Sequence, residues 1–181
     1  NNLKVIRPFL NLKKNDLKYV TLNYFKTYII DPSNKDDKLY YDLILIGTPP
    51  DTHLKIANKI LKDSPPKLLH IEKPFCTPDF KNLSSFLEIL KKTRTQVIGG
   101  YNHTLTKNTK LSEKILKKDP IGKILTITSY NREHWKSIFK AHPWIKGPSG
   151  SYLGFTKRGG GSLLEHSHAI NIWQHFANFL K

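Results

Sequence analysis

Three short apolar runs, each followed by a longer segment of mixed polarity, organise the middle of the chain. The runs cover residues 43–47, 68–72 and 96–99. Runs of this length, alternating with segments whose apolar residues recur at helical spacing, are typical of a parallel β-sheet with helical crossovers. The pattern therefore predicts an α/β fold in which these three strands are adjacent and parallel.

The segments between the runs predict two helices. The first has a candidate cap at Asp51 or Thr52. The second is expected to begin at Thr77-Pro78, because proline is favoured just after a capping residue. The apolar stripes are expected at Leu54, Ala57, Ile60 and Leu61 in the first helix and at Phe80, Leu83, Phe86, Leu87 and Leu90 in the second.

The pattern changes after the third run. A short helix is expected over 110–118, and residues 123–130 alternate between apolar and polar as in a half-buried strand that opens a second domain. Beyond an aromatic-rich loop, a triple glycine at 159–161 leads into a last helix that begins at about Ser162. One wedge of that helix carries Glu165, His168, Asn171, Ile172 and His175.

Each predicted strand has polar residues at or just after its carboxyl end: 48–53, then Glu72, which ends the second strand, with Lys73 and Pro74, then 101–103. Ligands bind at this edge of parallel α/β sheets. A lysine placed there can stabilise negative charge that develops on a substrate oxygen. The sequence therefore predicts a site centred on Lys73, and we expect Asn102 to line it together with Tyr101 and His103.

The succession of TPPxTH at 48–53, EKP at 72–74, GYN at 100–102 and GGGSLLEHSH at 159–168 resembles the glucose-fructose oxidoreductase and inositol dehydrogenase (Gfo/Idh/MocA) family. The resemblance covers residues 41 to about 176. It implies a nicotinamide-dependent oxidoreductase that uses NAD or NADP to interconvert a secondary alcohol and a ketone. The substrate class that it implies is a sugar, a cyclitol or a nucleotide-linked sugar.

Members of that family open with a strand and a Gly-rich turn, whereas the first glycine here is Gly47, and the chain contains no methionine. We therefore expect the chain to be an internal fragment of a longer, homo-oligomeric parent protein. The fragment is expected to be inactive by itself. Residues 1–101 would form an incomplete dinucleotide-binding Rossmann-like domain that lacks its first strand and Gly-rich loop. Residues 102–181 would begin a C-terminal α/β domain for substrate binding and oligomerisation.

The resemblance also implies roles for single residues. Lys73 would contact both substrate and nicotinamide, His168 would be the acid/base for the substrate hydroxyl, and Glu165 would complete the catalytic set. Asp31 is a candidate for the adenosine ribose, although Asp before Pro is also a plain turn signal. Cofactor contacts are expected from Thr48, Pro49, Pro50, His53, Glu72, Lys73 and Asn102, and substrate contacts from Lys73, Asn102, Trp144 and His168.

Two positions depart from the commonest family pattern, which has aspartates where this chain has Leu164 and Asn171. The nearest carboxylate, Glu165, is displaced by one residue and could substitute. The departures keep an alternative open, in which the fold and a sugar-phosphate or nucleotide-sugar pocket are retained in a non-catalytic binding or regulatory protein. In either case, stacking faces and donors suited to a sugar ring are offered by Arg132, His134, Trp135, His142, Trp144 and Tyr152.

Composition argues against several other classes of protein. The net charge is +16, but only four of the 30 basic residues are arginines and these are scattered, which argues against a nucleic-acid partner. No apolar run approaches the roughly 20 residues of a membrane span, so we expect a cytoplasmic protein without a membrane partner. The single cysteine, Cys76, cannot form an internal disulfide.

No metal site is expected, because His166 and His168 face different ways on a helix. The triple glycine lacks the Lys-Ser/Thr ending of a phosphate loop. Its predicted role is close approach of the backbone where the second domain meets the cleft.

Overall fold

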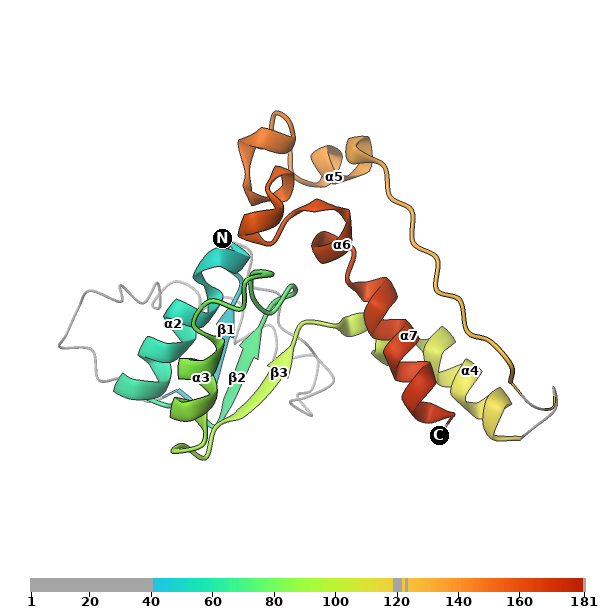
Figure 1. Ribbon diagram of the computed structural model, residues 1–181, viewed down its shortest axis with the longest axis horizontal. Coiled ribbons are helices and arrows are strands. Elements are labelled where there is room, and N and C mark those ends of the chain that lie inside the picture. The colour runs from blue at the N-terminus through green and yellow to red at the C-terminus, as the bar shows by residue number, and fades with distance from the viewer. Residues whose placement is uncertain (1–40, 119–121, 123, 181) are drawn as a thin grey trace, which may run out of the picture. The chain divides into compact units, whose positions relative to one another are not determined.

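The computed structural model of the chain describes residues 41–118, 122 and 124–180 (Figure 1). They belong to one compact unit. Asp31, the candidate for the ribose, lies outside the described residues. In the part of the chain that the structure describes, no helix combines the length and the apolar character that crossing a membrane requires.

The predicted sheet is present. Strands β1 (Leu43–Ile46), β2 (Leu68–Ile71) and β3 (Gln96–Gly99) are parallel and adjacent in the order β1-β2-β3. Ile46 pairs with Ile71, and Ile71 pairs with Gly99, so the three strands end in register. The segments that follow them therefore emerge together at one edge.

Helices α2 (Pro50–Asp63) and α3 (Leu83–Leu90) lie side by side against the sheet (Figure 1). Their apolar stripes meet the strands in one core, and the central ring is Phe86, which packs edge-on against Phe75 at a centroid distance of 5.6 Å. Burial of these apolar side chains holds the helices and strands together. It therefore also holds in place the sheet edge at which the candidate site lies. The fully buried apolar members are Ile46, Leu54, Ala57, Leu61, Leu69, Ile71 and Phe86.

The predicted starts of both helices were wrong. Helix α2 begins at Pro50 and is capped by Pro49 without a side-chain bond, so neither Asp51 nor Thr52 is the cap. Helix α3 begins six residues after Thr77, whose hydroxyl instead donates to Asp79 at 2.6 Å in a turn.

The predicted stripe of α3 was partly wrong for the same reason. Phe80 precedes the helix with a φ of 53°, a left-handed conformation that does not continue a helix, and it is 64% exposed. Leu87 is 46% exposed. Only Phe86 is fully buried on this helix, and the rest of its core-facing side is partly buried.

After β3 the chain forms a 3₁₀ turn, η3 (Asn102–Leu105), and then α4 (Lys107–Lys117), which starts three residues earlier than expected. The last helix, α7 (His168–Phe179), lies beside α4 (Figure 1), and the His175 Nε2 to Glu113 Oε1 contact of 2.8 Å joins the two. The intervening helical elements are α5 (Trp135–Ala141), η4 (Pro148–Gly150), η5 (Tyr152–Gly154), η6 (Thr156–Arg158) and α6 (Gly161–Glu165).

The strand predicted over 123–130 was wrong for the residues that the structure describes there, 124–130, which are extended but belong to no sheet. Leu125 is 83% exposed. The backbone carbonyl of Ile127 accepts a hydrogen bond from Trp173 Nε1 at 3.1 Å. An alternating pattern becomes a strand only when another strand supplies a hydrogen-bonding ladder.

The single helix predicted from Ser162 was also wrong, because it is broken into α6 and α7 at His166 and Ser167. His166 has φ −97° and ψ 24°, outside the helical range. Glu165 and His168 therefore lie on different helices rather than on one helical face.

Candidate active site

Lys73 lies two residues after Ile71, the last residue of β2, and is bound by one residue that is distant in sequence. Its Nζ donates to Glu165 Oε1 at 2.8 Å and to the Glu165 backbone carbonyl at 2.7 Å. The two side chains are only 13% and 19% exposed. A charged pair held this far from water is electrostatically much stronger than one on the surface.

The break between α6 and α7 explains how Glu165 offers two acceptors. In an unbroken helix its carbonyl would accept from the amide of Ala169, but that amide donates to His166 instead. The Glu165 carbonyl is therefore free to accept from Lys73. The ammonium is held by a side chain and by the main chain of the same residue.

Tyr152 binds the second carboxylate oxygen of Glu165. Its hydroxyl donates to Glu165 Oε2 at 3.1 Å. Burial, followed by the negative charge of Glu165, raises the pKa of the Tyr152 phenol well above its ordinary value, so the hydroxyl stays protonated and available as a donor. Lys73 and Tyr152 thus fix the Glu165 carboxylate from two sides.

His168, the first residue of α7, lies between two rings. Its imidazole stacks on that of His103 with centroids 3.9 Å apart and planes at 12°, and it meets Tyr101 edge-on at 5.8 Å. The Tyr101 hydroxyl donates to Ser167 Oγ at 3.2 Å. These contacts place the His168 ring without using its Nδ1, which is buried and has no hydrogen-bond partner among the described residues.

The surroundings of His168 favour its neutral form. Burial, then the charges of His103 and Lys73, lower the pKa of His168 from 6.5 to about 4, and Glu165 opposes this shift. A neutral imidazole near an ammonium group can accept a proton from a hydroxyl that the ammonium polarises.

The glycine run brings this segment against the sheet edge. A Cβ at Gly159 would lie 2.5 Å from Pro50 Cβ, and one at Gly160 would lie 2.1 Å from the Tyr152 carbonyl oxygen. Arg158 Nε also donates to Asp51 Oδ2 at 2.7 Å. The triple glycine therefore makes a close backbone approach, which was predicted, to Pro50 and Tyr152.

The residues predicted for the cofactor divide into exposed and buried groups. Thr48 and Pro49 after β1, and Asn102 after β3, are exposed at the sheet edge. His53 is fully buried, with Nε2 2.6 Å from the Thr48 carbonyl and Nδ1 3.1 Å from the Pro74 carbonyl. Its ring therefore ties together the loops that follow β1 and β2, which positions their residues.

Burial lowers the pKa of His53, so the imidazole is neutral and can donate to only one of these carbonyls. Pro50 is buried beneath Gly159. The half-buried Glu72 carboxylate lies against Gly100, where a Cβ would come within 2.8 Å of its Oε2.

Trp144 and His166 have contacts that do not involve Lys73. Trp144 is 64% exposed and packs edge-on to His142 at 5.2 Å. His166 Nδ1 lies 3.1 Å from Glu133 Oε2, away from the ring stack of His168. Among the described residues, no three His, Cys, Asp or Glu side chains are grouped as a metal ion would require.

Two contacts were not predicted. The sequence placed Tyr152 among possible stacking residues and His103 among residues lining the site, but not the bond of Tyr152 to Glu165 or the stack of His103 on His168. Tyr152 belongs to one of the three short 3₁₀ elements that precede α6. The periodicity of apolar residues therefore carries no information on its contact with Glu165. The stack of His103 on His168 joins residues 65 positions apart. The only signal in the sequence was that His103 follows a predicted strand and His168 follows the triple glycine.

Comparison with known proteins agrees with this geometry at the level of the fold. The chain matches no family model and no curated protein. Among solved structures it is similar to myo-inositol 2-dehydrogenase from Lactobacillus plantarum, with a TM-score of 0.59 and 18% identity over 91% of this chain and 46% of that one.

Two further dehydrogenases have comparable similarity. Apo scyllo-inositol dehydrogenase from Lactobacillus casei gives a TM-score of 0.57 and 17% identity over 80% of this chain and 39% of that one. Levoglucosan dehydrogenase, in complex with NADH and levoglucosan, gives 0.54 and 19% over 81% and 36%. The chain spans less than half the length of each.

The chain is thus a partial Rossmann-like α/β structure with a parallel sheet. Its fold is similar to the folds of these three dehydrogenase structures, as expected from the order of the sequence motifs.

Proposed function

We propose that the whole protein containing this segment is an NAD(P)-dependent dehydrogenase that interconverts a secondary alcohol and a ketone on a sugar, a cyclitol or a nucleotide-linked sugar. The observation that carries the proposal is the half-buried pair of Lys73 Nζ and Glu165 Oε1 at 2.8 Å, next to a neutral His168. An ammonium donor and a neutral base together match the charge changes of alcohol oxidation.

The proposed roles follow from the contacts. Lys73 donates to the substrate oxygen and stabilises the negative charge that develops there as its proton leaves. His168 accepts that proton in oxidation and returns it in reduction. Glu165, fixed by Tyr152, keeps the Lys73 ammonium in place.

A bound nicotinamide ring would accept the hydride from the alcohol carbon or return it to the ketone. The residues at the sheet edge suit such a group. Thr48 and Asn102 are exposed and carry a hydroxyl and an amide, and the Lys73 ammonium adds a cationic donor. We propose that Thr48, Pro49, Lys73 and Asn102 contact the cofactor directly. His53, Glu72 and the buried Pro50 act by shaping the loops.

For the substrate, we propose contacts from Lys73, Asn102, His168 and Trp144. A sugar or cyclitol offers hydroxyl groups for the first three and an apolar ring face for an indole. The exposed face of Trp144 is suited to such stacking. We further propose the domain division at residues 101 and 102 and a homo-oligomeric, cytoplasmic parent.

The first test is cofactor binding by this chain. NADH and NADPH are titrated into the unmutated chain and into the Lys73→Met and Lys67→Met variants. Nicotinamide fluorescence reports the binding. Lys67 forms an exposed pair with Asp42 of the same length, 2.8 Å, and serves as the matched control. Weaker binding in Lys73→Met alone supports the proposed edge site.

The second test is turnover by the whole protein, followed by formation of the reduced nicotinamide with panels of cyclitols and sugars. Lys73→Ala should lower turnover by on the order of a hundredfold, and His168→Ala by roughly a hundred- to ten-thousandfold. Unchanged turnover in both variants would contradict the proposed roles. Cofactor and sugar binding without any turnover would favour the non-catalytic alternative, in which Asn171 replaces a carboxylate.

A further inference from the structure

The stack of His103 on His168 brings two imidazole rings of the site face to face. The centroids are 3.9 Å apart and the planes differ by 12°. Two imidazoles this close compete for positive charge, because two unit charges near 4 Å repel each other strongly even in a polar medium. A proton on either ring therefore disfavours a proton on the other.

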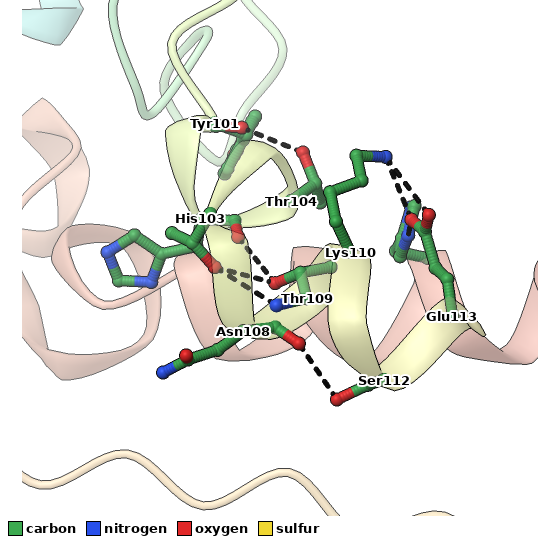
Figure 2. Close-up of polar contacts among 10 residues, drawn as sticks. Tyr101, His103, Thr104, Asn108, Thr109, Lys110, Ser112 and Glu113 are labelled. Carbon is green, nitrogen blue, oxygen red and sulfur yellow. Dashed lines mark hydrogen bonds and ion pairs between the residues drawn. The ribbon is translucent and has the colours of Figure 1, made fainter. Parts of the chain in front are cut away.

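His103 is held in place by its backbone rather than by its ring. Its carbonyl accepts from Thr109 Oγ1 at 2.7 Å and from the Thr106 amide at 3.3 Å. Figure 2 shows the ring projecting away from these contacts, at the start of the helix that they stabilise. The imidazole is exposed, so it can exchange protons with solvent.

His168 depends on ring packing for its orientation. Its Nδ1 has no hydrogen-bond partner among the described residues, so no bond at that atom sets the tautomer or the ring plane. The flat face is covered by His103 and an edge contact comes from Tyr101. Removal of the His103 ring would leave the plane of His168 without its main support.

We propose that His103 is a positioning residue for His168, holding its imidazole flat against the site and keeping it unprotonated whenever His103 itself carries a proton. The assignment of a base role to His168 rests on the proposed function. The contact itself and its effect on the proton do not. His103 would touch neither the substrate nor the reacting atoms.

Other charges face His168 and have to be separated from the effect of His103. Lys73 and His166 act in the same direction as His103, and Glu165 acts against them. Tyr101 adds an edge contact. A variant that keeps the ring stack and removes only the second titratable group isolates the effect of His103.

The test is an NMR titration of the imidazole Cε1–H signals of the 181-residue chain, with the His168 signal assigned by its loss in His168→Gln. His103→Phe keeps an aromatic face and removes the competing proton. The titration midpoint of His168 should then rise by roughly 0.5 to 1 pH unit. The midpoint of His53, whose pKa burial lowers, should stay constant as an internal control.

His103→Ala completes the design, because it removes both the ring and the charge. It should raise the midpoint and also broaden or shift the His168 signal at high pH, where charge repulsion is absent. An unchanged His168 midpoint in His103→Phe would overturn the proposal, as would a midpoint near 6.5 in the parent chain. Absence of turnover in the whole protein would overturn the proposed function and leave this titration valid.

Discussion

Lys73 and Glu165 form a 2.8 Å ion pair across 92 positions of sequence, and their side chains are 13% and 19% exposed. Lys67 and Asp42 form a pair of the same length, but their side chains are 85% and 81% exposed. The two pairs differ in burial and not in distance. They therefore allow the effect of burial on an ion pair to be measured within one chain.

Lys73→Met should destabilise the chain by about 2–3 kcal/mol, because it leaves the half-buried Glu165 carboxylate without its cation. Lys67→Met should leave stability nearly unchanged, since water already solvates the Asp42 carboxylate. Urea unfolding monitored by circular dichroism measures both variants. Equal losses in the two variants would show that burial of the Lys73 pair has no energetic importance.

Stability should fall as the pH falls from about 6.5 toward 4. The pKa of His168 lies at about 4 in the folded chain, below its ordinary 6.5, so in this window the unfolded chain binds a proton that the folded chain does not. The contribution is fully present above pH 6.5 and is lost as the pH falls to about 4.

Urea unfolding at several pH values in that window checks this prediction. His168→Gln should reduce the slope of stability against pH. It should not abolish the slope, because burial also lowers the pKa of His53 and of His70. A slope identical to that of the parent would show that His168 titrates normally in the folded chain.

Gly159→Ala should destabilise the chain by about 2–4 kcal/mol. The residue has φ 94°, and its Cβ would lie 2.5 Å from Pro50 Cβ, so backbone strain and overpacking add. Gly122→Ala is the control, because Gly122 has φ 70° but no atom within 4 Å of its Cβ. Its cost should be about 1 kcal/mol, from backbone strain alone. Similar unfolding midpoints for the two variants would mean that the contact with Pro50 can relax.

Phe86→Ala should cost about 3–5 kcal/mol, because the ring is 2% exposed and its removal leaves a cavity beside Phe75. Leu87→Ala, at the next position of α3, should cost less than about 1 kcal/mol, because Leu87 is 46% exposed. Thermal and urea unfolding of the pair check the position of the core on this helix. A larger loss of stability for Leu87→Ala than for Phe86→Ala would show that Leu87, and not Phe86, lies on the face of α3 that packs against the sheet.

The sheet could be predicted from sequence because burial and periodicity are local properties. Leu68 to Ile71 is apolar except at His70 and is followed by Glu72 and Lys73, which is close to the pattern of a central parallel strand. Residues 124–130 carried an equally clear alternation but belong to no sheet. Alternation reports which side chains prefer burial, and it does not report whether a partner strand is available.

The site was predicted less completely for a related reason. Glu165 and His168 were expected to point toward Lys73 from a single helical face, but Glu165 binds Lys73 from the end of α6, whereas His168 is the first residue of α7. Two tertiary contacts lie at the break at His166 and Ser167, namely the bond from Tyr101 to Ser167 and the stack of His103 on His168. Helical spacing cannot anticipate such contacts, because they come from segments about 65 positions away.

The interruption between α6 and α7 has a consequence for tolerance to change at position 165. Half of the anchorage of Lys73 is a peptide oxygen, which every amino acid supplies. Substitution of the glutamate would remove the charge but leave this ligand in place, provided that the helix stays interrupted. The location of the lysine is therefore encoded partly in the path of the main chain, and it is insulated from side-chain variation at the residue that holds it.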